Sequence, residues 1–151
     1  LGGGTGLAAA CDMAIAADDA SFATSEVKFG IIPAVISPYV LRAIGPRHAL
    51  RYFQSAERFG AAEAKARGLV NEVVPVAELD AAVDRLVQAL LACGPQAQLA
   101  AKQLIAALAG RPIDDAVSEE TAIRIARQRA TAEAREGFAA FFEKRPPAWM
   151  A

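Results

Sequence analysis

The chain has 151 residues, a formal net charge of −1 and an apolar fraction of 54%. This length suits one domain of ordinary size with a real core, and the absence of a basic block argues against nucleic acid or an anionic membrane as a partner. No apolar run reaches the length of a membrane-spanning helix, and so large an apolar fraction often means that another subunit or segment covers part of the surface.

The first expected element is a helix over residues 3–11, which begins in a run of glycines at residues 2–4. Glycine lets the backbone approach a ligand closely, and a helix that starts there directs free N–H groups and a positive dipole end toward it. The segment predicts either a site for an anion or a developing oxyanion, or a tight turn into a buried, alanine-rich helix. The glycines alone do not decide between the two.

A candidate acid–base residue, Glu26, follows two short extended segments that are expected at residues 12–17 and 21–23. It precedes a loop that is rich in apolar residues. These are Val27, Phe29, Ile31 and Ile32. A carboxyl group beside apolar side chains is partly desolvated, which suits a general acid or base. The alternative is a surface glutamate at the end of a strand.

The rest of the chain is expected to be mostly helical, with one further strand at residues 69–74. The expected helices cover residues 37–54 with a break at Gly45-Pro46, and residues 61–67, 76–92, 96–109, 114–130 and 132–143. A few short strands followed by helices indicate an α/β fold, the end of an α/β domain with a helical appendage.

The inventory of reactive side chains excludes several kinds of chemistry. His48 is the only histidine, stands at an expected surface helix start, and cannot form a zinc set with two distant cysteines, so no metal is expected. No Gly-Lys-Ser/Thr motif follows the glycines. Cys11 and Cys93 are expected to be small buried hydrophobic residues in a reducing compartment, the cytoplasm, rather than a disulfide. A carboxylate and backbone N–H donors remain.

Four stretches, in the same order, resemble the crotonase family of enoyl-CoA hydratases and isomerases. They are residues 2–12, 21–33, 58–75 and 136–147. The resemblance extends over essentially all 151 residues and implies the C-terminal half of such an enzyme, which agrees with a start on a glycine turn without an initiator Met. It implies the end of a ββα spiral core with the active-site loop over residues 1–75, and a helical region that forms trimers, often paired into hexamers, over residues 76–151.

The resemblance also implies an acyl-CoA thioester as substrate, with no cofactor besides the coenzyme A in that substrate. Two backbone N–H groups hold the enolate-like oxygen; one matches Gly3, and the other belongs to an upstream segment outside this chain. Hydratases of the family commonly use two glutamates. One matches Glu26, but the position of the other is Gly6. Family isomerases typically use one carboxylate, so both reactions stay open.

Residues 32–39, with Ser25-Glu26-Val27 before them, are similar to the bacterial methylglutaconyl-CoA and isohexenylglutaconyl-CoA hydratases of leucine and acyclic terpene catabolism. The family's C-terminal helix also contacts the nucleotide end of coenzyme A in a neighbouring subunit, and the matching positions are Phe141 and Lys144. The ammonium group of a lysine is a positive point charge that suits contact with a phosphate. The alternatives are trimer packing for Phe141 and a solvated helix-end charge for Lys144.

Three functions follow from these expectations. The first is an enoyl-CoA hydratase that adds water to a branched, methylglutaconyl-like thioester, and the second is an enoyl-CoA isomerase with Glu26 as its sole base. The third is a binding or assembly fragment that is inactive without an N-terminal half. The expected partners are an acyl-CoA thioester and further copies of the chain, as a trimer or a dimer of trimers.

Overall fold

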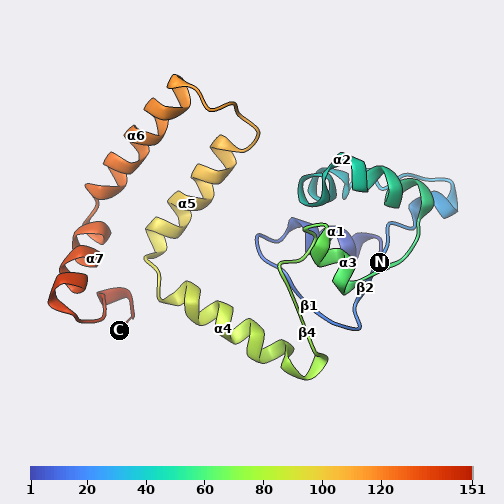
Figure 1. Cartoon of the computed structure of the whole chain (residues 1–151), viewed down its shortest axis with the longest axis horizontal. Helices are drawn as coiled ribbons and strands as arrows, with labels where there is room; N and C mark the ends of the chain where they lie inside the picture. The colour runs from blue at the N-terminus through green and yellow to red at the C-terminus, as the bar shows by residue number, and fades with distance from the viewer. Residues whose placement is uncertain (151) are drawn as a thin grey trace. The chain divides into compact units, whose positions relative to one another are not determined.

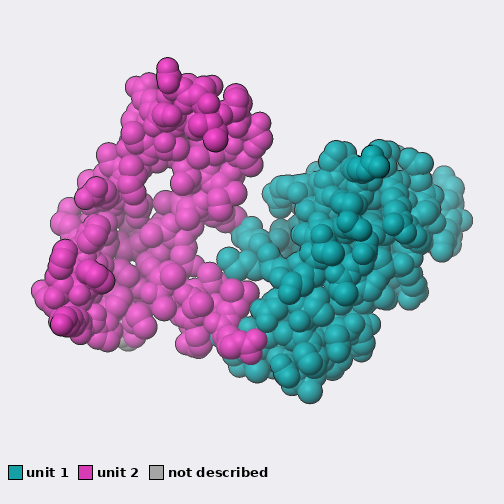
Figure 2. All heavy atoms as spheres, viewed as in Figure 1, with its two compact units in different colours: residues 1–84 teal, residues 85–151 magenta. Residues whose placement is uncertain are grey.

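The structure, a computed structural model, describes residues 1–150 and contains two compact units. The units are Leu1–Asp84 and Arg85–Ala151 (Figure 2). Their boundary lies within helix α4 (Leu79–Leu91), later in the chain than the division expected after residue 75.

The first unit combines short strands with helices, as expected for an α/β fold (Figure 1). Its elements are α1 (Gly3–Ala10), β1 (Ile15–Ala17), β2 (Ser21–Phe22), the 3-10 helix η1 (Glu26–Phe29), α2 (Ser37–Ser55), β3 (Phe59–Gly60), α3 (Ala61–Ala66), β4 (Glu72–Val74) and the 3-10 helix η2 (Val76–Glu78). β1 pairs in parallel with β4, and β2 pairs antiparallel with β3. A parallel pair needs a long crossover connection, and α2 and α3 lie in it.

Helix α2 contributes four buried residues to the core of the first unit. Within each half of the helix its buried residues share one face, with Val40 and Ile44 four positions apart before Gly45 and Ala49 and Tyr52 three positions apart after it. The expected break is confirmed at Gly45, whose φ of 72° and ψ of 164° are not helical. Pro46 follows and has no N–H to continue the helical hydrogen bonds, so α2 bends between the two halves that carry these buried residues.

The strands β1 and β4 are shorter than the expected segments at residues 12–17 and 69–74 because a side chain continues their pairing. The N–H of Ala14 donates to Asn71 Oδ1 at 2.8 Å, and the N–H of Asn71 donates back to the carbonyl of Ala14 at 2.8 Å. The two-residue strand β3 was not expected. It exists because Phe59 pairs with Phe22, far away in sequence.

The second unit is helical and contains α5 (Pro95–Leu108), α6 (Asp115–Arg129), α7 (Ala132–Glu143) and the 3-10 helix η3 (Ala148–Met150). α5 contacts both α6 and α7 (Figure 1). The side chains of Asp114 and Thr131 each accept one backbone N–H in the first turn of α6 and α7, respectively. These helices match the expected ones. None of the helices in residues 1–150 is both long and apolar enough to cross a membrane.

The expectation that both cysteines are buried is wrong. Cys11 and Cys93 are exposed free thiols, because each follows the last turn of a helix and bonds back to a carbonyl of that turn, Leu7 for Cys11 and Ala89 for Cys93. Apolar side chains also remain exposed in both units. Examples are Leu7, Ile32, Ile105, Ile113, Phe141 and Phe142.

Candidate active site

The chain enters α1 through a glycine turn that leaves one backbone N–H free. Gly2 has φ of 52°, a left-handed value that favours glycine, and its N–H donates to the carbonyl of Ala23 at 2.8 Å. The N–H groups of Gly4 and Thr5 donate to Leu1 and Gly2, respectively. The N–H of Gly3 donates to no acceptor within residues 1–150. The expected donor is therefore exposed and available to a ligand.

Glu26 is the first residue of η1 and lies against this turn. Its Oε1 atom is 3.6 Å from the position that a Cβ on Gly2 would take. Its Oε2 atom is buried and accepts no hydrogen bond within the part of the chain that the structure describes. Buried carboxylate oxygens are almost always hydrogen-bonded, so an unpaired one marks a group that is free to meet a ligand. The structure thus brings together the glycine turn and Glu26.

Three of the four apolar side chains expected beside the Glu26 carboxylate are exposed to solvent. Phe29, Ile31 and Ile32 are exposed by 76%, 60% and 72%. η1 ends at Gly30 in a left-handed conformation, with φ of 72°, and the loop beyond it lies open to solvent. Glu26 is nevertheless half-buried, and Gly2 is a neighbour of its carboxylate that the structure identifies.

Gly6, where the sequence lacks a second carboxylate, does not leave a hole. A Cβ on Gly6 would stand 2.2 Å from Cγ2 of Ile36 and 2.7 Å from its Cβ. Ile36 is 8% exposed and belongs to the core. An apolar side chain thus fills the space beside position 6. Sequence reasoning missed Ile36 as a partner of Gly6, although Gly6 stood out as a departure from the family pattern and Ile36 lies in the segment 32–39 that resembles one subgroup.

Two buried threonine hydroxyls, also missed from the sequence, hold the segment that precedes Glu26. Thr5 Oγ1 donates to the carbonyl of Ala23 at 3.2 Å, and Thr24 Oγ1 donates to the carbonyl of Tyr52 at 2.9 Å. No signal in the local sequence distinguishes such a hydroxyl from an ordinary one.

Within residues 1–150, no cluster of three or more His, Cys, Asp or Glu side chains could hold a metal ion.

The comparison with protein families agrees with this geometry. The model of the enoyl-CoA hydratase/isomerase family matches residues 1–151. The chain belongs to the enoyl-CoA hydratase/isomerase (crotonase) family.

Several members of this family are similar over nearly the whole chain. Carnitinyl-CoA dehydratase of Escherichia coli is 36% identical over 155 aligned positions, covering 99% of this chain and 59% of the relative. An enoyl-CoA hydratase structure from Shewanella pealeana is 46% identical with a TM-score of 0.91, covering 97% of this chain and 55% of that one. AtuE of Pseudomonas aeruginosa is 37% identical with a TM-score of 0.90, covering 99% and 58%. The chain spans little more than half of the length of the curated relatives that it matches end to end, from 54% to 59%.

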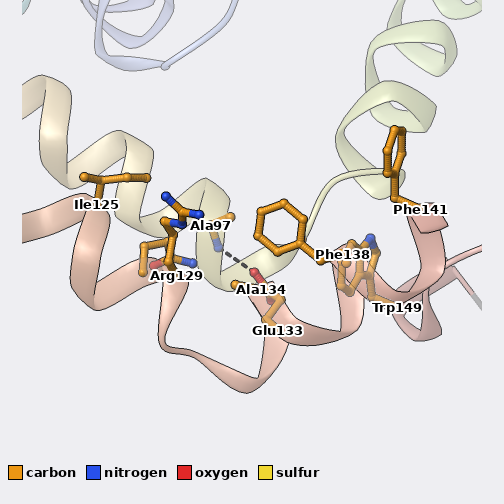
Figure 3. A pocket seen from close by; sticks show the side chains of 11 residues that line it. Ala97, Ile125, Arg129, Glu133, Ala134, Phe138, Phe141 and Trp149 are labelled. Carbon is orange, nitrogen blue, oxygen red and sulfur yellow. Dashed lines mark hydrogen bonds between the residues drawn. The ribbon is translucent and has the colours of Figure 1, made fainter.

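Phe141, one of the two residues expected to contact coenzyme A, lines a cavity of about 500 Å³ in the second unit (Figure 3). Phe138, Phe141 and Trp149 form one end of the cavity, and Ile125 and Arg129 lie at the other end. Phe141 is 75% exposed. Its aromatic character and exposure suit contact with a flat ligand ring or with another apolar surface.

Glu133 also lines the cavity, and its carboxylate is held by the start of α5. The Glu133 carboxylate accepts the N–H of Gln96 at 2.9 Å and the N–H of Ala97 at 2.7 Å, so it caps the first turn of α5. Gly94 permits this approach, because a Cβ there would stand 2.5 Å from Glu133 Oε1.

Lys144, the other residue expected to contact coenzyme A, is exposed and is not among the residues that line the cavity. It ends α7 in a left-handed conformation with φ of 55° and ψ of 40°. This conformation is unfavourable for a residue with a Cβ. Its N–H donates to the carbonyl of Phe141 at 3.3 Å, which satisfies one of the last carbonyls of the helix.

Proposed function

We propose that this chain carries the acid–base carboxylate and one oxyanion donor of an enoyl-CoA hydratase, a lyase that acts on a branched, methylglutaconyl-like 2-enoyl-CoA. The observation that carries the proposal is the buried, unpaired Oε2 of Glu26 beside a glycine turn whose Gly3 N–H is free. Relatives named as hydratases and as a dehydratase support addition or removal of water as the reaction.

In the proposed reaction, the oxygen of a water molecule forms a bond to C3 of the enoyl group while Glu26 takes a proton from that water. The electron pair of the C2–C3 double bond moves toward the thioester, and the Gly3 N–H stabilises the enolate oxygen. Glu26 then returns the proton to C2. One oxyanion donor is typically worth about 3 kcal/mol of barrier. We place the second donor outside these 151 residues.

Double-bond isomerisation is the second candidate function, and the contact between Gly6 and Ile36 favours it. Position 6 is a glycine, and Ile36 fills the space beside it, so this chain supplies no second carboxylate there. A single base that removes a proton at one carbon and returns it at another needs no second acid. Glu26 alone can perform that transfer.

The experiment that tests the proposal is turnover of a panel of enoyl-CoA thioesters by the protein as its gene encodes it, in ¹⁸O-labelled water. A hydratase incorporates ¹⁸O into its product, and an isomerase moves the double bond without it. Glu26→Gln is expected to lower kcat by about 10²- to 10⁴-fold. Glu78→Gln is the matched control, because Glu78 stands in the first turn of the other 3-10 helix of this unit. Retained turnover in Glu26→Gln would exclude the proposed role.

We further propose that the chain assembles into a trimer or a dimer of trimers and binds the nucleotide end of coenzyme A through Phe141 and Lys144. The exposed apolar side chains of the second unit support assembly, since Ile113 is exposed by 95% and Phe142 by 76%. Sedimentation velocity and coenzyme A binding test both points. A 151-residue chain that aggregates and binds no coenzyme A would favour the third function, an inactive fragment. The two free thiols fit a cytoplasmic location.

A further inference from the structure

We propose that Thr5 is a positioning residue of this site, whose buried hydroxyl fixes the oxyanion turn against the segment that carries Glu26. The inference rests on the proposed roles of Gly3 and Glu26. It concerns a side chain that touches neither substrate nor reacting atoms and acts only through the backbone.

A single carbonyl oxygen joins the two halves of the site. The carbonyl of Ala23 accepts the N–H of Gly2 at 2.8 Å and the hydroxyl of Thr5 at 3.2 Å. Gly2 directly precedes the Gly3 donor, and Ala23 stands shortly before Glu26 in a short connection without regular structure. One hydrogen bond would let α1 pivot about the carbonyl. Two hydrogen bonds from separate points of the first helical turn fix its orientation.

The burial of these groups makes the link rigid. Thr5 is 1% exposed and Ala23 is 3% exposed, so water does not compete for either hydrogen-bonding group. A threonine in a helix often bonds to a carbonyl of its own helix, one turn back. Thr5 instead bonds across to a residue 18 positions away in sequence. The hydroxyl thus serves a contact between segments rather than its own helix.

The segment before Glu26 is also held from its other side, because Thr24 donates to the carbonyl of Tyr52 in α2. Thr5 differs from Thr24 in what it connects. Thr5 ties the carboxylate segment to the oxyanion donor, whereas Thr24 ties that segment to the core. Loss of the Thr5 hydroxyl should therefore change the angle between Glu26 and the Gly3 N–H. A misplacement of about 1 Å in such a geometry lowers a rate by about 10²-fold.

The test compares Thr5→Val, Thr5→Ser and Tyr52→Phe in the protein as its gene encodes it. Thr5→Val keeps the shape and leaves Ala23 with the Gly2 N–H as partner, so no acceptor loses its last bond. We expect kcat to fall by about tenfold or more with KM changed by less than about twofold, and Thr5→Ser to restore kcat. Tyr52→Phe removes another hydroxyl from the same core, one that bonds Glu63 at 2.7 Å, and should leave kcat unchanged.

A second readout does not depend on turnover. Hydrogen exchange at the Gly2 amide should accelerate by about tenfold or more in Thr5→Val and stay unchanged in Tyr52→Phe, because only the first variant loosens the turn. Unchanged exchange and unchanged kcat in Thr5→Val would overturn the inference. An equal loss of kcat in Tyr52→Phe would also overturn it, since that loss would reflect general stability.

The two readouts separate this inference from the proposed function. If the parent protein turns over no enoyl thioester, the proposed function fails and hydrogen exchange alone decides whether Thr5 fixes the turn. If Thr5→Val does not fold, Thr5→Ala removes the same hydroxyl without adding a methyl group, and it is read by the same two measurements.

Discussion

Replacing Gly6 with alanine would place a methyl group 2.2 Å from Cγ2 of Ile36, far inside van der Waals contact. Ile36 is 8% exposed and has little room to move. Overpacking of this kind costs about 1 to 3 kcal/mol, against which alanine gains about 1 kcal/mol over glycine inside a helix. We expect Gly6→Ala to lower the free energy of unfolding by up to about 2 kcal/mol, as measured by urea denaturation.

Gly4→Ala is the matched control, because Gly4 lies in the same helix and a Cβ there would meet no atom within 4 Å. It should be neutral or stabilising by about 1 kcal/mol. Ile36→Ala should cost about 2 to 5 kcal/mol alone. The double variant Gly6→Ala/Ile36→Ala should be more stable than the sum of its parts predicts, by about 1 to 3 kcal/mol. Equal stability of Gly6→Ala and Gly4→Ala, or strict additivity, would refute the contact.

Three further predictions concern the second unit. Lys144→Gly should raise the free energy of unfolding by about 1 kcal/mol by relieving the left-handed conformation, whereas Lys144→Gln should not, and both should weaken coenzyme A binding by about two- to fivefold in calorimetry. Glu133→Ala removes the cap of α5 and should lower the free energy of unfolding by about 1 kcal/mol, as measured by thermal denaturation followed through the helix signal in circular dichroism. Hydrogen bonds from Arg145 and then from a backbone N–H lower the pKa of Glu136 from its ordinary 4.5 to about 2. Their stabilisation of the C-terminal turn should be complete above pH 4.5 and lost as the pH falls toward 2, which Trp149 fluorescence would report in the parent protein but not in Glu136→Gln.

The helices could be predicted from the sequence because their signals are local. The kink in α2 follows from Gly45 and Pro46, and the later helices follow from apolar spacing between glycine and proline breaks. The strands were less predictable. β3 exists only through its pairing with β2, and Asn71 replaces part of β4 with a side-chain bond.

The candidate site shows the same contrast. Its reactive groups, Gly3 and Glu26, could be proposed from glycine content and from the resemblance to the family, and their roles stay predictions. The contacts that shape the site could not. Ile36 beside Gly6 depends on how a distant loop packs, and so does the direction of the Thr5 hydroxyl. The exposure of the apolar loop after Glu26 also could not be predicted from its composition.

The packing of Ile36 against Gly6 has an evolutionary consequence. A glutamate introduced at position 6 alone would collide with Ile36, and a smaller residue introduced at position 36 alone would leave a cavity in the core. Each step alone loses stability before any second carboxylate can be used. The two positions are therefore expected to change together among homologues, so that passage between one-carboxylate and two-carboxylate sites requires a paired substitution.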